Sequence, residues 1–434
     1  MTKDPHPTDD IFTSEKFHRA VRRRRGAESR LKFLGAAAIT VATGLLLILF
    51  VSISTQGYTA FTQTQISVPI NLASDQLVAG DKPVEEVIKA ANFRALVREG
   101  LEARLGAPDT RRGRRDMMAL VTPSAAYFVQ QEVLKNPDWI GTAREFWLPA
   151  SDDIDIIIKG FAPRDVPEEQ RLINDRQLAW LSRLETGGLL EGRFNSMFFF
   201  GNDSREPEIA GIFGAAVGSI LMLAVTLIVS LPLGVAAAIY LEEFAPKNWW
   251  TEFIDVNIRN LAAVPSIVFG LLALAVFIRL FGIPRSTPLA GGLALSLLTL
   301  PTIIIAARAA IAAVPPSLRE GALELGASKL QTVTQVVLPS AMPGILTGTI
   351  ISMAEALGET APLLMIGMVA FMVDTPVGIT DPAAPLPVQI YTWSTSPERA
   401  FAEKTAAAIM VLLVLLVFMN SLAIYLRNRF QHKW

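Results

Sequence analysis

The chain has no cysteine and only three histidines among its 434 residues. The missing thiols exclude disulfides, thiolate-bound metals and cysteine nucleophiles. The histidines lie near the termini, outside the apolar stretches, so we expect no histidine-based metal site or catalytic triad; they are His6, His18 and His432. No Walker A sequence occurs, so we expect no ATP hydrolysis by this chain. We predict no enzymatic activity, no metal and no cofactor in this chain.

Charged residues are also scarce. They make up 18% of the sequence, against about 25% in average soluble domains. In contrast, 51% of the residues are hydrophobic and the mean hydropathy is +0.40. This composition is typical of a membrane protein, and the formal net charge of −1 gives no reason to expect a nucleic-acid partner.

The amino-terminal part combines a basic tail with one apolar run. Residues 1–32 are polar and basic, with a row of arginines at positions 22 to 25. Residues 33–54 carry no charge and come close to the roughly 20 residues that a transmembrane helix needs. A signal peptide is the alternative, but the basic region is too long for one and no cleavage site stands out. We predict an uncleaved first transmembrane helix with the amino terminus in the cytoplasm.

Residues 55–207 differ in composition from the apolar runs, because they hold most of the acidic residues and arginines. We predict an extracytoplasmic domain of mixed α/β structure, with amphipathic helices at 84–106 and 165–186 and a short strand at 154–158. Three neighbouring acids suggest a metal site, but no EF-hand spacing follows and a solvated turn is the better interpretation; they are Asp152, Asp153 and Asp155. The sequence does not indicate the role of this domain.

Residues 208–427 read as a second membrane region. Its apolar runs bring the predicted total to six transmembrane helices; they fall near 209–241, 261–281, 289–313, 341–370 and 403–426. Gly344 and Gly348 have the GxxxG spacing that permits close helix contact. Alternation from a cytoplasmic start places the loops 242–258 and 315–339 and the tail 428–434 in the cytoplasm. The predicted fold class is therefore mostly α, a polytopic membrane protein.

The loop at 315–339 is polar and contains several residues that typically begin or end helices. Pro315 and Pro316 end the preceding helix, and Ser317 with Glu320 has the spacing of a capping box. Gly326 predicts the end of this first short helix, and a second begins at Ser328. Leu338-Pro339 is expected to end the segment before the next membrane run. Such a hairpin either presents a surface to a partner or only links two spans at the membrane interface.

A resemblance favours the partner surface. Glu320-Gly321-Ala322, then Gly326, then the stretch ending in Leu338-Pro339, is similar to the EAA loop of bacterial ABC importer permeases, with Gly321 in place of the first alanine. In that family the loop is the coupling helix that docks in a groove of the cytoplasmic ATPase. The resemblance implies that these residues contact an ATP-binding subunit.

Few ionisable residues lie within the later apolar runs. Arg308 lies near the inner end of the fourth span, and Glu355 and Glu359 lie within the fifth. Charges there cost about 3 kcal/mol each on insertion scales, so they usually face a cavity or a partner. The two glutamates are four residues apart and are predicted to share a helix face, while Gly358 and Pro362 are predicted to bend the helix.

Four longer stretches resemble one branch of the family, the PstA-type permeases of the phosphate-specific ABC importers. They are LPLGVAAAIYLEEFA (231–245), AAVPSIVFGL (262–271), LTLPTIIIAARAA (298–310) and LGETAPLLMIG (357–367). The resemblance implies a type I ABC importer permease core over 208–427 and a substrate path near Arg308, Glu355, Glu359 and Thr360. The chain departs from the branch at Glu355, where the family usually has the arginine implicated in the anion path, and at Ala309, where it often has glutamate.

The resemblance also implies partners and a mechanism. They are a second permease of the PstC type, a dimer of ATP-binding subunits and a periplasmic phosphate-binding protein. Arg308 would attract the anion. Glu359 would pair with an arginine of the other permease or accept a hydrogen bond from hydrogen phosphate, or both glutamates would pair within the bundle, which we favour for Glu355. A permease for another oxyanion or a phosphonate, and a membrane sensor or scaffold that contacts an ATPase, remain alternatives; a secondary transporter is disfavoured because no broken helices recur in the two halves.

Overall fold

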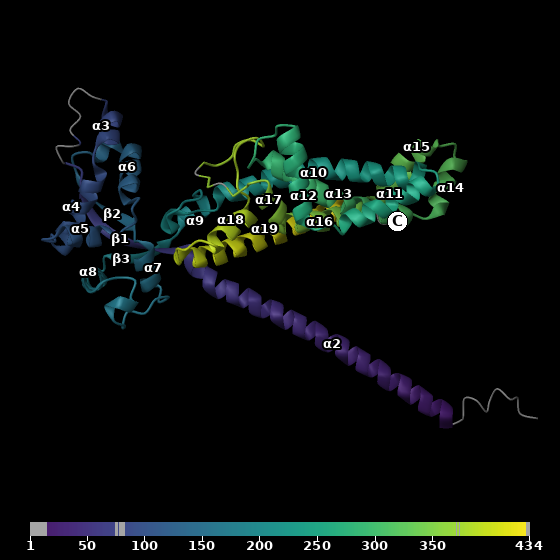
Figure 1. Cartoon of the computed structure of the whole chain (residues 1–434), viewed down its shortest axis with the longest axis horizontal. Helices are drawn as coiled ribbons and strands as arrows, with labels where there is room; N and C mark the ends of the chain where they lie inside the picture. The colour runs from purple at the N-terminus through teal and green to yellow at the C-terminus, as the bar shows by residue number, and fades with distance from the viewer. Residues whose placement is uncertain (1–14, 74–76, 78–82, 370, 373, 431–434) are drawn as a thin grey trace, which may run out of the picture. The chain divides into compact units, whose positions relative to one another are not determined.

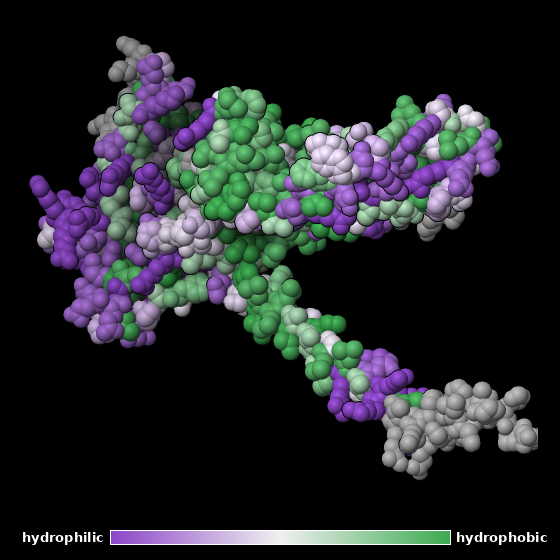
Figure 2. Space-filling view, turned by 45° about the vertical axis from the view of Figure 1, so that its right-hand side comes forward, coloured by the Kyte–Doolittle hydropathy of each residue, from purple (hydrophilic) through white to green (hydrophobic). Residues whose placement is uncertain are grey.

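The computed structural model describes residues 15–73, 77, 83–369, 371–372 and 374–430. The chain divides into two compact units, residues 1–56 and residues 57–434. The first consists of one long helix, α2 (Glu15–Gly57). Its most apolar stretch has no buried residue within the protein, and Figure 2 shows this stretch as a run of hydrophobic side chains. An unbroken helix with an uncovered apolar surface is suited to lipid contact.

The second unit begins with a small antiparallel sheet in the order β2-β1-β3. The strands are β1 (Thr62–Asn71), β2 (Ala143–Pro149) and β3 (Leu190–Phe194), and Ile66 of β1 lies opposite both Leu148 and Leu190. Helix α4 (Phe93–Leu105) packs closely on β1, because a side chain in place of Gly100 would collide with the carbonyl of Pro69. This packing gives the sheet its own apolar core.

Five further helices surround or follow the sheet. They are α3 (Val84–Ala90), α5 (Arg111–Met118), α6 (Ala125–Lys135), α7 (Asp152–Ile158) and α8 (Asp175–Thr186). Short 3-10 turns separate some of these elements: η1 (Tyr58–Phe61), η3 (Pro137–Trp139), η4 (Glu168–Gln170) and η5 (Pro207–Ile209). Figure 1 shows these helices gathered around the sheet, so residues 57–207 have the mixed α and β structure that we expected.

The prediction of a strand at 154–158 is wrong. These residues belong to helix α7, whose first turn contains Asp152, Asp153 and Asp155. Carboxylates in the first turn are stabilised by the helix dipole, and this local preference outweighs the β propensity of the isoleucines that follow.

The two predicted amphipathic helices are shorter or divided. The helix expected at 84–106 is interrupted at Ala91 and restarts under the cap of Asn92, whose side chain accepts a hydrogen bond of 3.1 Å from the Ala95 N–H. The helix expected at 165–186 begins only at Asp175, where Asn174 and Gln177 form a capping box. In both places an asparagine cap sets the boundary.

The remainder of the unit is a helical bundle. Its long helices are α10 (Phe213–Ile239), α13 (Pro288–Ala312), α16 (Leu338–Gly358) and α19 (Ala400–Phe430). Shorter elements complete it: α9 (Ser196–Phe200), η6 (Tyr240–Phe244), α11 (Trp249–Ala262), α12 (Ser266–Ala273), η7 (Leu274–Leu280), α17 (Ala361–Met365) and α18 (Leu386–Ser394). The described residues contain five helices long and apolar enough to cross a membrane, or six if the bent pair formed by α11 and α12–η7 counts as one.

The third predicted run, 261–281, is not a straight helix. Helices α11 and α12 meet at an angle of 102° around Pro265, which precedes α12. Proline cannot continue a helix, so the chain turns there. Helix α11 has no buried residue, and its Trp249, Trp250 and Phe253 side chains are all more than half exposed.

Small residues allow α13 to lie at the centre of the bundle. Side chains at Gly344 and Gly348 of α16 would collide with Ala310 and Ala306 of α13, so these two helices touch along their small residues. This confirms the close contact that the GxxxG spacing allows. Figure 2 shows hydrophobic side chains concentrated over part of the bundle and hydrophilic ones over the sheet-containing part.

Polar contacts join the bundle to the sheet-containing part. Lys159, which directly follows α7, forms ion pairs of 2.7 Å with Asp155 and 2.8 Å with Glu403 of α19. The Lys404 Nζ donates a 2.8 Å hydrogen bond to the Ala210 carbonyl. These groups are largely buried, so the two parts are held together by specific charged contacts in addition to apolar packing.

Candidate functional site

The polar hairpin at 315–339 lies at one end of the bundle (Figure 1). Its first helix, α14 (Pro316–Glu324), follows Pro315, and no side chain caps it. The predicted capping box of Ser317 and Glu320 is therefore wrong: proline fills the first helical position, which places Ser317 one residue inside the helix.

The turn between the two short helices follows the sequence prediction. Gly326 adopts a positive φ of 87°, which a glycine tolerates without strain. The N–H of Ala327 donates to the Ala322 carbonyl at 3.1 Å, and this bond closes α14. Ser328 and Gln331 then form a capping box at the start of α15 (Lys329–Thr332). The hairpin geometry is thus set by local residues.

Leu338-Pro339 does not end the hairpin, contrary to prediction. Helix α15 continues through the wide π-turn η8 (Val333–Val337) into α16, and the three together form one candidate span from Lys329 to Gly358. Pro339 lies in the first turn of α16, where its missing N–H is tolerated. The second half of the hairpin is therefore continuous with a membrane helix, so a force applied to it acts directly on that helix.

The hairpin exposes apolar side chains in a polar setting. No residue of α14 is buried, and three leucines are exposed: Leu323 by 51%, Leu325 by 91% and Leu330 by 62%. Of the EAA-like residues, Glu320 and Gly326 are exposed, while Gly321 and Ala322 are half-buried. Exposed apolar groups gathered on one hairpin are typical of a surface that a partner covers.

Arg319 fixes this hairpin to the bundle, and the sequence reasoning did not single it out. Its guanidinium binds Glu243 of η6 at 2.9 Å and donates a 2.8 Å hydrogen bond to the Ile311 carbonyl at the end of α13. The paired acids at 242–243 in the predicted inner loop were the available signal. Because Arg319 holds two elements at once, it links the hairpin to the ends of α10 and α13.

Arg308 also lies in this ion-pair network. Its guanidinium hydrogen-bonds to Asp255 of α11 and to Glu242 of η6, the latter at 3.3 Å. Within the described part of the chain, it has no hydrogen bond or ion pair with Glu355 or Glu359. The charge of Arg308 is therefore offset by two carboxylates in this conformation.

The remaining predicted path residues lie where α16 breaks. Gly358 ends α16, Glu359 follows in extended conformation, and Thr360 precedes α17, in which Pro362 lies in the first turn. The predicted bend is confirmed. The prediction that Glu355 and Glu359 share a helix face is wrong, because only Glu355 is helical. Glu355 is exposed, and Glu359 and Thr360 are half-buried.

Neither glutamate is neutralised inside the protein. In the part of the chain that the structure describes, the side chains of Glu355 and Glu359 have no hydrogen bond and no ion pair. Pairing within the bundle, which we favoured for Glu355, is therefore wrong for the described residues. Two free carboxylates beside a helix break are available to a substrate or to a neighbouring subunit.

Acidic residues do not gather into a metal centre. Among the described residues, no group of three or more histidine, aspartate or glutamate side chains is placed to hold a metal ion. Asp155 instead pairs with Lys159, and Asp152 accepts a hydrogen bond from the Asp153 N–H at 2.9 Å.

The chain matches two known families. Residues 230–432 match the binding-protein-dependent transport system inner membrane component, and residues 18–168 match a domain of unknown function, DUF3333. A probable ABC transporter permease protein of Bacillus subtilis, YqgI, is 34% identical over 224 residues, covering 49% of this chain and 76% of that protein.

Phosphate transport system permease proteins are similar to the same extent. PstA 1 of Mycobacterium tuberculosis is 33% identical, covering 51% of this chain and 72% of its own, and PstA of Yersinia pestis is 32% identical, covering 52% and 77%. Among solved structures, the inward-facing MetNI methionine ABC transporter covers 51% of this chain and 95% of its own, with 16% identity and a TM-score of 0.41.

The chain belongs to the binding-protein-dependent transport system inner membrane components, the permease subunits of ABC importers. Within this family its relatives include PstA-type permeases, with 30–33% identity over about half of this chain. It is therefore a multi-pass inner-membrane protein that works with an ATPase and a substrate-binding protein.

Proposed function

We propose that this chain is the permease subunit of an ATP-driven importer of inorganic phosphate and forms half of the translocation path. The observation that supports this most is its 33% identity to a phosphate permease over 222 residues. The coupling loop alone would fit a permease for another oxyanion or a phosphonate equally well.

In this proposal the hairpin faces the cytoplasm together with both termini. The exposed leucines and the EAA-like residues Glu320 to Ala322 dock on a nucleotide-binding subunit. ATP binding and hydrolysis move the hairpin, and the movement reaches the spans through the continuous α15–α16 helix and through Arg319. The second half of the path comes from a related permease of the PstC type. This chain itself hydrolyses no ATP.

The two free carboxylates receive different roles. Hydrogen phosphate carries a P–OH donor at neutral pH, which sulfate lacks, and an accepting carboxylate at Glu359 discriminates between the two anions. Glu355, on the exposed side of α16, pairs with a basic residue of the neighbouring permease. Arg308 attracts the anion only in a conformation that opens its bonds to Asp255 and Glu242.

Uptake of radiolabelled phosphate at low external concentration, with and without the gene, tests the proposed substrate. We expect high-affinity uptake to be lost in the deletion strain and restored by the intact gene. Normal phosphate uptake together with loss of another oxyanion would contradict the proposed substrate. Normal uptake of all of them would favour a sensor or scaffold.

Because the chain has no cysteine, a single introduced thiol is a unique probe of coupling. We expect Ala322→Cys to form a disulfide crosslink with a cysteine placed in the docking groove of the ATP-binding subunit. Glu85→Cys, which places the thiol on exposed α3, is the matched control and should form none. Crosslinking from Glu85 alone, or labelling of Ala322→Cys from outside intact cells, would contradict the proposed topology.

A further inference from the structure

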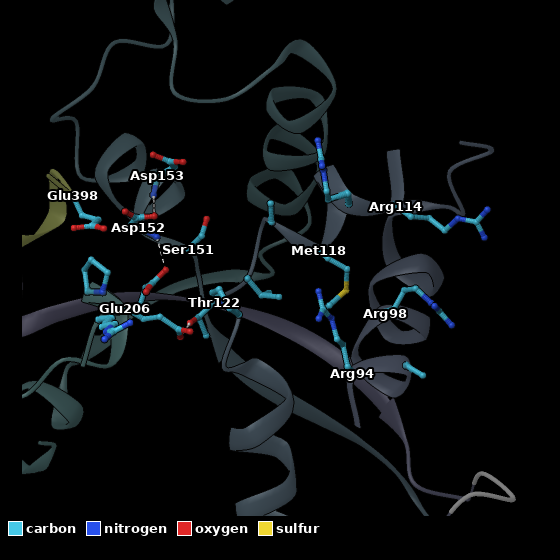
Figure 3. A pocket seen from close by; sticks show the side chains of 18 of the residues that line it. Arg94, Arg98, Arg114, Met118, Thr122, Ser151, Asp152, Asp153, Glu206 and Glu398 are labelled. Atoms are coloured by element: carbon cyan, nitrogen blue, oxygen red, sulfur yellow. Dashed lines mark hydrogen bonds between the residues drawn. The ribbon is translucent and has the colours of Figure 1, made fainter. Parts of the chain in front are cut away.

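The sheet-containing part holds a cleft of about 670 Å³ that the transport mechanism does not use. Helices α4 and α5 form one wall, and the start of α7 with residues 205–208 and Glu398 forms the other (Figure 3). The volume lies within the range of about 300–1,000 Å³ that is typical of small-molecule sites.

One wall of the cleft is mainly acidic, although Arg205 lies on it and Arg399 and Lys404 lie near its carboxylates. Five carboxylates line it, and in the described part of the chain none of them forms an ion pair; they are Asp152, Asp153, Glu206, Glu208 and Glu398. Glu206 is held by the Ser124 hydroxyl at 2.6 Å, and Glu208 by the Asp152 N–H at 2.9 Å. Like charges gathered in this way repel one another unless a cation lies among them.

Two polar atoms at this wall are buried and unpartnered. Glu208 is 6% exposed and Ser151 is 8% exposed, yet the Glu208 Oε2 and the Ser151 Oγ have no hydrogen-bond partner among the described residues. Burial is the main cause that raises the pKa of Glu208 to about 7, and the neighbouring Asp152 and Glu206 raise it further. An unsatisfied buried polar atom costs about 1–3 kcal/mol, so a hydrogen-bond partner for either atom would be favourable.

The opposite wall carries four exposed arginines, of which only Arg98 has an ion-pair partner among the described residues. Among the described residues, Arg94, Arg114 and Arg115 form no ion pair, and Arg98 lies 3.9 Å from Glu102. Figure 3 shows Arg94 beside Met118, while Arg98 and Arg114 extend away from the labelled acidic residues. The apolar floor between the walls includes Met118.

We propose that this cleft binds a small dipolar solute, with an ammonium group against Ser151 and Glu208 and an oxyanion group against Arg94 and Arg98. An ammonium supplies three hydrogen-bond donors, which suits the unpartnered oxygens, and a guanidinium fork suits a phosphonate, phosphate or carboxylate. A metal ion is disfavoured because no three described carboxylates are placed to ligate one. Inorganic phosphate alone would leave the acidic wall uncompensated, so this site is distinct from the proposed transport path.

The same chemistry is available from a free solute or from a lipid headgroup. The acidic wall lies close in sequence to two spans, because Glu206 and Glu208 precede α10 and Glu398 precedes α19. A lipid headgroup could therefore reach this wall. A phosphatidylethanolamine headgroup carries an ammonium group and a phosphate, the same two charges as a soluble aminoalkylphosphonate. The experiment must separate these two sources.

Calorimetric titration of the purified full-length chain tests the proposal. The probes are ω-aminoalkylphosphonates of increasing chain length, the matching alkylphosphonates and the matching alkylamines. We expect at least one dipolar probe to bind about tenfold more tightly than either single-charge analogue, about 1.4 kcal/mol. Equal binding of the alkylphosphonate, or no binding by any dipolar probe, would overturn the proposal.

The lipid source is tested by the same titration in nanodiscs. If phosphatidylethanolamine discs suppress binding of the soluble probe and phosphatidylglycerol discs do not, the occupant is a lipid headgroup. If both disc types leave binding unchanged, the occupant is a free solute. Phosphate uptake is measured in parallel, so a failure of this site is distinguishable from a failure of the proposed transport function.

Substitutions locate the two ends of the ligand. We expect Arg94→Ala to reduce binding of the dipolar probe to that of the alkylamine, and Glu208→Gln to reduce it to that of the alkylphosphonate. Arg111→Ala, on exposed α5 but outside the cleft, is the matched control and should bind normally. If Glu208→Gln does not fold, Glu398→Gln on the exposed rim serves instead. Unchanged binding in both wall variants would reject the site.

Discussion

Two groups of charges distinguish the ends of this molecule. At the base of the hairpin, Arg308 and Arg319 are both paired with carboxylates of other elements. In the cleft of the sheet-containing part, arginines and carboxylates line the same cavity, and among the described residues no ion pair joins its two walls. Partly buried charges that are paired hold elements together, whereas unpaired ones cost free energy unless something binds them. The comparison separates a structural network from a candidate ligand site.

Removing Arg319 should have the largest effect. Arg319→Ala leaves Glu243, whose side chain is 11% exposed, without its cation and frees two backbone carbonyls. Loss of one partner of a buried pair costs about 3–5 kcal/mol, so we expect lower thermal stability in detergent and loss of uptake.

The control for this variant is Arg259→Ala. Arg259 is 69% exposed and also pairs with a carboxylate, Asp255. An exposed pair is worth about 0–1 kcal/mol, so the control should behave as the wild type. Equal stability of the two variants would remove the distinction between partly buried and exposed ion pairs.

The acidic cleft should make stability fall as pH rises. The folded-state pKa of Glu208 is about 7, above its ordinary value of 4.5, so the folded protein binds more protons than the unfolded chain between these values. The contribution of Glu208 to the free energy of unfolding is fully present below pH 4.5 and is lost as the pH rises through about 7. The expected loss is about 3 kcal/mol.

Thermal unfolding across this pH range, with wild type and Glu208→Gln, measures the effect. We expect the wild type to lose stability and the variant to lose less, because the variant has no carboxyl at this position. The charged groups facing Glu208 are Asp152, Glu206 and Lys404, and they remain in both proteins. Glu85→Gln, at a fully exposed carboxylate, is the control. Identical pH profiles for wild type and Glu208→Gln would show that the pKa of Glu208 is not raised in the folded protein.

A smaller effect is expected on anion selectivity. Glu359→Gln keeps the shape of the side chain but weakens its acceptor and adds a donor. We expect sulfate to compete with phosphate uptake about tenfold better in the variant, about 1.4 kcal/mol. Glu355→Gln is the matched control, because Glu355 lies on α16 before the break. Unchanged competition by sulfate in Glu359→Gln would reject the proposed hydrogen bond.

The smallest effect concerns the two serines of the hairpin. Ser328→Ala removes the cap of α15 and should cost about 1 kcal/mol, seen as a small drop in thermal stability. Ser317→Ala should be nearly neutral, because Ser317 caps nothing. The reverse order would mean that the capping box lies where the sequence first suggested.

The hairpin was largely predictable, since its turn depends on neighbouring residues. Gly326 and Ser328 act within one or two helical turns, and both predictions hold. The prediction for Leu338-Pro339 failed because the helix continues through the π-turn η8 into α16, with Pro339 in the first turn of α16, and no local pattern indicates this.

The cleft could not be predicted. Its lining comes from positions as far apart as Arg94 and Glu398, brought together by packing across the sheet-containing part. The partners of Arg308 were equally inaccessible, because Asp255 approaches it only after the chain turns at Pro265. Sequence patterns report local preferences, whereas these contacts depend on the tertiary fold.

The turn at Pro265 has a consequence for helix α11. Helix α11 presents two stacked indoles, Trp249 and Trp250, and such rings settle among lipid headgroups. Meanwhile Asp255 on the same helix binds Arg308 in the central helix of the bundle. Helix α11 therefore combines an exposed pair of indoles, which is suited to the membrane surface, with a charged contact to the central helix.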